Sequence, residues 1–213
     1  MLLLAVLLPV QVATAREQAV CPVSEQAVQV EVRFAPAQPF VDDSQSAAWI
    51  QNAARALHHP IGLTVSRLAH TLTAHFEVRA TANRRARCVH LRSVSLELGY
   101  PNTKIYIADG YPPGGCAYQA IHRHEMEHVR ILNAHQENAL PAWRTRLQAL
   151  ARAQAQRPLL SENPQQAQQQ ILHEMEAGVQ KEIRQLDKAQ KAAQAAIDTP
   201  QSYADVRASC RKW

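Results

Sequence analysis

The 213-residue sequence lacks the marks of several protein classes. Its one apolar run, about twelve residues from Met1 to Val12, is shorter than the ~20 residues that span a bilayer, so stable membrane insertion is not expected. Aromatic residues are only 5% of the chain, and none is interleaved with the arginine cluster at 83–87, so nucleic acid is not an expected partner. No Gly-x-Ser-x-Gly nucleophile motif is present, and Gly114-Gly115 lacks the Lys-Ser/Thr of a phosphate loop.

What is present is typical of a globular protein, with 46% hydrophobic and 19% charged residues. The net charge of +5 is unevenly spread, because seven arginines and one acid, Glu77, lie between Arg55 and Arg92. Such a basic face could attract an anionic partner. The arginine cluster at 83–87 is more simply explained as a solvated hairpin loop.

Residues 1–15 are predicted to be a secretory signal peptide, since an apolar stretch leads to small residues at Ala13 and Ala15. The remaining residues, 16–213, are enough for a single domain. Export to the bacterial envelope, as a secreted or periplasmic protein, fits four cysteines with no Cys-x-x-Cys pair. We expect two disulfides, for which the sequence allows three connectivities: the cysteines are Cys21, Cys88, Cys116 and Cys210.

The order of elements predicts an α+β fold, with residues 16–113 mainly β and 114–213 mainly α. Period-two alternation and turn signals predict a twisted, mostly antiparallel sheet of about five strands, at 28–34, 63–68, 72–80, 88–98 and 104–108, with a helix at 44–57. Helices are expected after the turn at 109–115, over 116–133, 141–156 and 164–197. The last has an apolar stripe that includes Ile171, Met175 and Val179, so it should pack against the rest of the domain.

The motif that carries chemistry is His-Glu-x-x-His at residues 124–128. On a helix, residues four apart lie on one face, so His124 and His128 can bind one divalent ion. Glu125 and Glu127 flank that face on opposite sides, and spacing alone does not say which one activates water. A chance match is expected about 0.03 times in a chain of this composition, so a metal site is the favoured interpretation over a histidine-rich surface helix.

On these five residues the sequence resembles the zincin metalloproteases, and more loosely the bacterial family of predicted secreted zinc-dependent proteases. The resemblance implies that His124 and His128 bind one Zn²⁺ per chain and that Glu125 is the general base. It also implies a zincin-like sheet followed by the active-site helix.

A catalytic zinc needs a third protein ligand, and the sequence offers two candidates. Glu174 is favoured, because its segment is similar to the Glu-x-x-Ala-Asp stretch of one group of gluzincins, although Gly178 stands where that group has aspartate. The glycine would let two helices approach closely. His135 is the alternative, but on a continuous helix it would lie about 10 Å beyond His128.

The resulting prediction is a zinc-dependent metallopeptidase acting on a peptide or protein substrate. We expect an edge strand at 103–108 to hold an extended peptide by main-chain pairing. The residue that stabilises the oxyanion is left open among His173, Tyr203 and Arg207. Two alternatives also remain open: a non-catalytic binding module with structural zinc or no metal, and a zinc amidase acting on peptidoglycan, which would suit the basic face.

Overall fold

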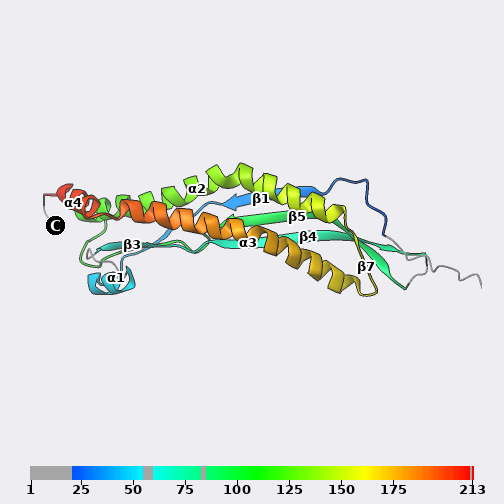
Figure 1. The fold of residues 1–213 in the computed structure, drawn as a ribbon. Helices are drawn as coiled ribbons and strands as arrows, with labels where there is room; N and C mark the ends of the chain where they lie inside the picture. The colour runs from blue at the N-terminus through cyan, green and yellow to red at the C-terminus, as the bar shows by residue number, and fades with distance from the viewer. Residues whose placement is uncertain (1–20, 55–59, 83–84, 212) are drawn as a thin grey trace, which may run out of the picture.

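The computed structural model describes residues 21–54, 60–82, 85–211 and 213, so the predicted signal peptide lies outside it. It confirms the α+β class, with mixed sheets followed by long helices (Figure 1). The elements in chain order are β1 (Gln29–Ala35), β2 (Phe40–Asp42), α1 (Ala47–Ala54), β3 (Gly62–Val65), β4 (Ala69–Ala80), β5 (Arg87–Gly99), β6 (Lys104–Ile107), α2 (Cys116–Ala155), β7 (Leu159–Ser161), α3 (Pro164–Ile197) and α4 (Pro200–Ala208).

The strands form two sheets, where the sequence pattern predicted one. The first has the order β1-β5-β4, with β7 also on β5, and the second has the order β2-β6-β3. β1 pairs in parallel with β5, and β2 in parallel with β6; the remaining pairs are antiparallel. The connection from β1 to β2 contains Pro36 and Pro39, and the connection from β5 to β6 contains Pro101. Proline has no N–H to donate to a strand ladder, so these residues favour an interruption between the two sheets.

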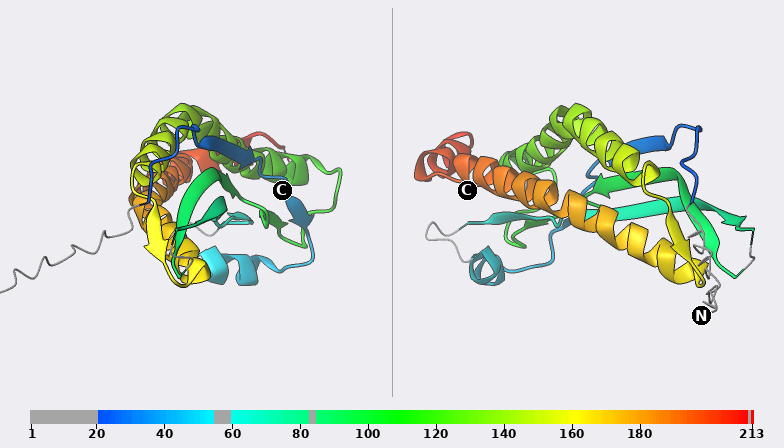
Figure 2. Two further views of the ribbon diagram at one scale, coloured as in Figure 1. Left: turned by 90° about the vertical axis from the view of Figure 1, so that its right-hand side faces the viewer. Right: turned by 45° about the vertical axis from the view of Figure 1, so that its right-hand side comes forward.

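Helix α2 runs without interruption over 40 residues, so the expected division before Pro141 is wrong. Proline removes one backbone donor, and α2 bends along its length (Figure 2). Residues beyond the proline bury apolar side chains against the first sheet, among them Trp143 and Leu147. This packing keeps the second half of the helix in place although the local hydrogen bond is lost.

Helix α3 buries the predicted apolar stripe, since Ile171, Met175 and Val179 are each at most 2% exposed. They belong to a core shared with α2, β1 and β5. A Cβ placed on Gly178 would lie 2.8 Å from a methyl carbon of Leu150, so the glycine does permit a close approach of α3 to α2. A second, smaller core lies between the first half of α2 and the second sheet.

Both expected disulfides are present, and their connectivity is Cys21–Cys88 and Cys116–Cys210. The second bond joins the first residue of α2 to the segment just after α4. Such bonds fit an oxidising compartment. None of the helices in the described ranges is long and apolar enough to cross a membrane.

Candidate metal centre

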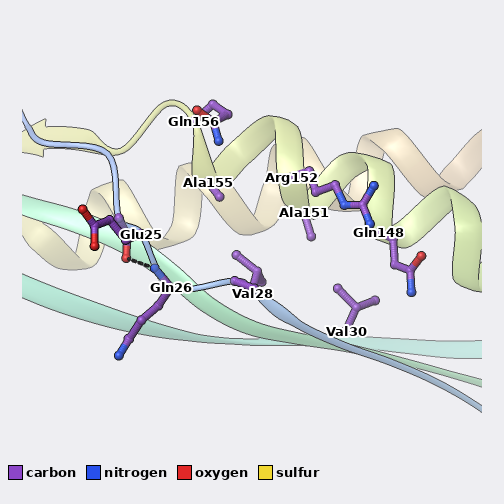
Figure 3. Close-up of a pocket in the computed structure, with 11 residues that line it drawn as sticks. Glu25, Gln26, Val28, Val30, Gln148, Ala151, Arg152, Ala155 and Gln156 are labelled. Atoms are coloured by element: carbon purple, nitrogen blue, oxygen red, sulfur yellow. Dashed lines mark hydrogen bonds between the residues drawn. The ribbon is translucent and has the colours of Figure 1, made fainter.

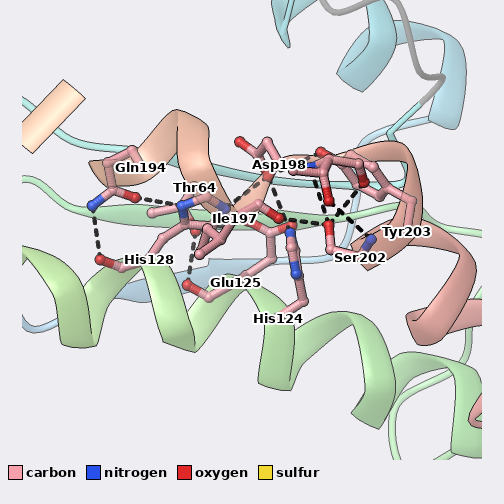
Figure 4. A network of polar contacts seen from close by, with 10 residues as sticks. Thr64, His124, Glu125, His128, Gln194, Ile197, Asp198, Ser202 and Tyr203 are labelled. Atoms are coloured by element: carbon pink, nitrogen blue, oxygen red, sulfur yellow. Dashed lines mark hydrogen bonds and ion pairs between the residues drawn. The ribbon is translucent and has the colours of Figure 1, made fainter. Parts of the chain in front are cut away.

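Three side chains, two from α2 and one from the residue after α3, converge beside α4 (Figure 4), which lies at one end of the molecule (Figure 1). Nε2 of His124 and Nε2 of His128 each lie 3.1 Å from Oδ1 of Asp198. The ligand atoms of the three residues all lie within 4.8 Å of one another. Within the part of the chain that the structure describes, no other cluster of three histidine, cysteine or carboxylate side chains is close enough together to hold a metal ion.

Local structure explains how the three side chains come together. His124 and His128 are one turn apart on α2, so their rings share a face, with centroids 5.2 Å apart. Asp198 is the residue immediately after α3. The next residue, Thr199, caps α4 in a reciprocal capping box with Ser202, which fixes the turn that carries Asp198.

The structure separates the two glutamates that spacing could not. Glu125 is 2% exposed, and its Oε2 accepts a hydrogen bond of 2.8 Å from the hydroxyl of Thr64 on β3. A Cβ on Gly62 would lie 2.5 Å from Oε1 of Glu125, so β3 comes this close only because a glycine stands there. Glu127 instead forms an ion pair with Arg130 on the outer side of α2.

The ionisable side chains of the group shift the pKa values of one another. Burial raises the pKa of Asp198, but hydrogen bonds from His124 and His128 outweigh it and hold that pKa well below its usual range. Burial lowers the pKa of His128, but the hydrogen bond to Asp198 and the charge of Glu125 outweigh it, so that pKa is raised. Burial raises the pKa of Glu125, and this effect exceeds the lowering by the charge of His128 and by the hydrogen bond from Thr64.

Tyr203 belongs to the same cluster, through its hydroxyl, which donates to Oδ1 of Asp198 at 3.1 Å. Its ring lies 5.4 Å from that of His124. Burial and the charge of Asp198 raise the pKa of Tyr203 well above its usual value, so it stays a neutral donor. Of the three candidates for stabilising the oxyanion, Tyr203 is therefore the one that lies in the group, whereas His173 is exposed on α3 and Arg207 lies on α4.

The favoured third ligand, Glu174, is not brought to the histidines. It is exposed and accepts a hydrogen bond from Gln170, one turn earlier on α3. At 1.5 Å per residue it lies about 36 Å along α3 from Asp198. His135 also stays outside the group and lines a hollow between α2 and α3 with Trp143. The carboxylate that the structure places beside the two histidines is that of Asp198 and not that of Glu174.

Sequence reasoning also missed Thr64 and Gln194. Gln194 lies one turn before Asp198, and its amide reaches both the ring and the backbone carbonyl of His128. Gln194 and Asp198 are four residues apart at the end of α3, the same spacing as that of the two histidines. This spacing is the signal in the sequence that could have identified Gln194 and Asp198. Thr64 carried no local signal, because its role depends on how β3 lies against α2.

A cavity of about 630 Å³ opens beside the group. It is lined by Glu125, His128, Asp198 and Tyr203, and on the opposite side by β3 and the end of α1. A separate hollow lies between the segment 24–30 and the last turns of α2, near Arg152 (Figure 3). That hollow shares no residue with the metal group.

The strand beside the cavity is not the one expected. The prediction that 103–108 forms an edge strand is wrong, because β6 lies between β2 and β3. Among the described strands β3 pairs only with β6. The N–H of Ala108 donates to the carbonyl of Ile61, so Gly62 and Thr64 direct their own backbone groups toward the open edge.

The donor set fits a metal ion. Ligand atoms bound tetrahedrally to zinc at about 2.0–2.1 Å lie about 3.3 Å apart, close to the two separations of 3.1 Å found here. Two imidazoles and one carboxylate leave a fourth position open. No family model, curated protein or solved structure matches the chain. What stands is therefore a His-x-x-x-His pair with a distant aspartate that could hold a metal ion.

Proposed function

We propose that this protein is an exported zinc-dependent hydrolase that cleaves peptide bonds, a secreted or periplasmic metallopeptidase. The observation that carries the proposal is the position of buried Glu125 directly beside the converging His124, His128 and Asp198, at the wall of an open cavity. A purely structural zinc site is closed by four protein ligands, whereas this one has three and faces the cavity.

His124, His128 and Asp198 would hold the ion. Two nitrogens and one oxygen suit zinc, although iron and manganese accept similar sets. When bound, zinc acts as a Lewis acid that polarises the scissile carbonyl and makes water a better nucleophile.

Glu125 supplies the proton transfer. Its carboxylate accepts a proton from water as the carbonyl is attacked and returns it to the leaving amine. Burial raises the pKa of Glu125 and so makes it a stronger base than an exposed glutamate. Thr64 restrains the carboxylate by its 2.8 Å hydrogen bond. Tyr203 is the nearby neutral donor that could stabilise the negative charge on the attacked oxygen.

A peptide substrate would lie along β3. The open edge of this strand offers backbone groups at Gly62 and Thr64, the two residues that contact Glu125. Main-chain pairing there would bring the scissile bond beside the base without need of a particular side chain. The role first expected for 103–108 therefore passes to β3.

The test compares zinc content and turnover in the oxidised protein. We expect about one zinc per chain and hydrolysis of a fluorogenic peptide library, with muropeptides as a parallel substrate set. Glu125→Gln should keep the zinc and lose about 10²–10⁴-fold in turnover. Glu127→Gln is the matched control and should retain both.

Each other result has a definite meaning. Unchanged turnover in Glu125→Gln would contradict the assigned base. Cleavage of muropeptides alone would replace the peptidase by the amidase. A zinc-loaded protein that hydrolyses nothing in either set would leave the non-catalytic zinc module as the better account.

A further inference from the structure

The ring of His128 has a second nitrogen, which faces α3 and not the metal group. Nδ1 of His128 is hydrogen-bonded to Oε1 of Gln194. The amide nitrogen of Gln194 donates to the backbone carbonyl of His128 at 3.0 Å. Figure 4 shows the amide spanning from the ring to the carbonyl of the same residue.

These two contacts fix the position of a hydrogen. A backbone carbonyl only accepts, so the nitrogen of the Gln194 amide must face it and the oxygen must face the ring. An amide oxygen also only accepts, so Nδ1 of His128 carries the hydrogen of that bond. Nε2, the atom that lies 3.1 Å from Asp198, is therefore the nitrogen left for a metal ion, which would take the place of the hydrogen that this atom donates to the carboxylate in the metal-free protein.

We propose that Gln194 is a positioning residue that selects Nε2 of His128 as the ligand atom and holds its ring toward His124 and Asp198. The inference relies on the proposed function only in requiring that the site bind zinc. Histidine ligands generally depend on such a partner for orientation and basicity. Here the amide of Gln194 also donates to the backbone carbonyl of His128. The orientation of the ring therefore depends on how α3 is aligned along α2.

That register matters because Gln194 lies in the last turn of α3 and Asp198 is the residue that follows the helix. The C-terminal end of α3 thus supplies one ligand and restrains another. A slip of α3 along α2 by one turn, about 5.4 Å, would remove both contacts at once.

The chain contains a matched control one turn earlier. Gln190 is 2% exposed, and its side-chain amide donates to the carbonyl of Leu132 on α2 at 3.5 Å. It therefore makes the same kind of contact between the helices but touches none of the three ligands. A general loosening of the helix pair would be seen in a Gln190 variant, whereas an effect on the ligand ring would not.

The experiment measures zinc affinity by competition with a chromogenic chelator, and Co²⁺ absorption as a spectroscopic signature of the coordination. Gln194→Leu should weaken zinc binding by about 10–100-fold and change the Co²⁺ spectrum. Gln194→Glu keeps an acceptor for Nδ1 and should recover about tenfold of that loss. Gln190→Leu should bind zinc within about threefold of the wild type, because it leaves the ligand partners in place.

Wild-type affinity in Gln194→Leu, or an equal loss in Gln190→Leu, would overturn the inference. Failure of Gln194→Glu to recover affinity would overturn the role of the acceptor. The peptidase proposal is judged separately, by turnover of the wild type: zinc binding without hydrolysis contradicts it and leaves the Gln194 comparison intact. A wild type that binds no zinc contradicts both.

Discussion

Oδ1 of Asp198 lies 3.1 Å from Nε2 of His128, although 70 residues separate the two in the chain. The contact joins the residue that follows α3 to the last residue of the histidine motif on α2. Asp198 alone is 39% exposed by its side chain, while the two histidine rings are at most 10% exposed. The carboxylate thus closes an otherwise buried pair from the solvent side.

The first prediction concerns this carboxylate. Asp198→Ala should lose more zinc affinity than the about 10–100-fold that removal of a ligand's hydrogen-bond partner costs, because a ligand itself is removed. Glu174→Ala should bind zinc as the wild type does. Both are measured by chelator competition. Loss of zinc from Glu174→Ala with retention in Asp198→Ala would restore the ligand set expected from the sequence.

A second prediction follows from the raised pKa of Glu125. The unfolded chain loses this proton near the usual value of 4.5, whereas the folded protein keeps it to higher pH. The wild type therefore loses stability as pH rises from 4.5 through the raised pKa. In zinc-free protein, Glu125→Gln should be the more stable form at pH 7, and the difference should vanish below pH 4.5.

Urea unfolding at pH 4 and pH 7 measures this difference. Glu127→Gln is the control, because Glu127 is only partly buried and its pKa is lowered by Arg130. Its free energy of unfolding at pH 7 should fall by no more than about 0.5 kcal/mol. Equal stability of Glu125→Gln and the wild type at both pH values would show that burying the ionised carboxylate of Glu125 costs no free energy of folding.

The sequence located the half of the site that is local. A helix places residues four apart on one face whatever it packs against, so His124 and His128 needed only their spacing. Which carboxylate lies beside the histidines depends on how α3 is placed along α2, and the sequence pattern does not give this. A helical wheel gives the side of α3 on which Glu174 lies but not its position along the axis relative to α2. That axial position places Glu174 far from the histidines. Asp198 reaches the histidines only through the turn that Thr199 and Ser202 fix.

The sheets show the same limit. Alternating apolar residues identified most of the strands, because that pattern depends on one strand and its two faces. Pairing is a relation between strands, and the pattern at 103–108 is the same for an edge and a central strand. Only the positions of β2 and β3 on either side of β6 decide this, and the three residues of β2 were too few to be recognised as a strand.

A third prediction concerns the Cys116–Cys210 bond. Helix α4 buries none of its residues, yet it carries Tyr203, and the disulfide ties its end to the start of α2. Replacing Cys116 and Cys210 by serine should cost about 2–4 kcal/mol of stability and should also weaken zinc binding, because the turn next to Asp198 loses its anchor. Urea unfolding and zinc competition measure the two effects.

The matched control is the other disulfide. Cys21–Cys88 closes a loop of similar length but attaches to β5 at the end of the molecule away from α4 (Figure 1). Its double serine variant should lose comparable stability and keep the zinc affinity of the wild type. Equal zinc affinity in both variants would show that α3 alone fixes Asp198.

The last prediction concerns His90, a buried histidine far from any proposed chemistry. It is 2% exposed, and neither ring nitrogen has a hydrogen-bond partner among the residues that the structure describes. Burial and the charge of Arg79 lower its pKa, so the unfolded chain takes up a proton near 6.5 and the folded protein only at lower pH. Stability attached to this residue is therefore lost as pH falls below 6.5.

His90→Phe should raise the free energy of unfolding by about 1–3 kcal/mol at pH 7, because an apolar ring of similar shape replaces two unpaired nitrogens. The gain should grow as pH falls below 6.5, since only the wild type then meets the cost of excluding a proton. His75→Phe, at an exposed position on the neighbouring strand, should change little at either pH. Urea unfolding at pH 5 and pH 7 decides it: a gain that is the same at both values would mean that the ring's packing, and not its charge, sets the stability at this position.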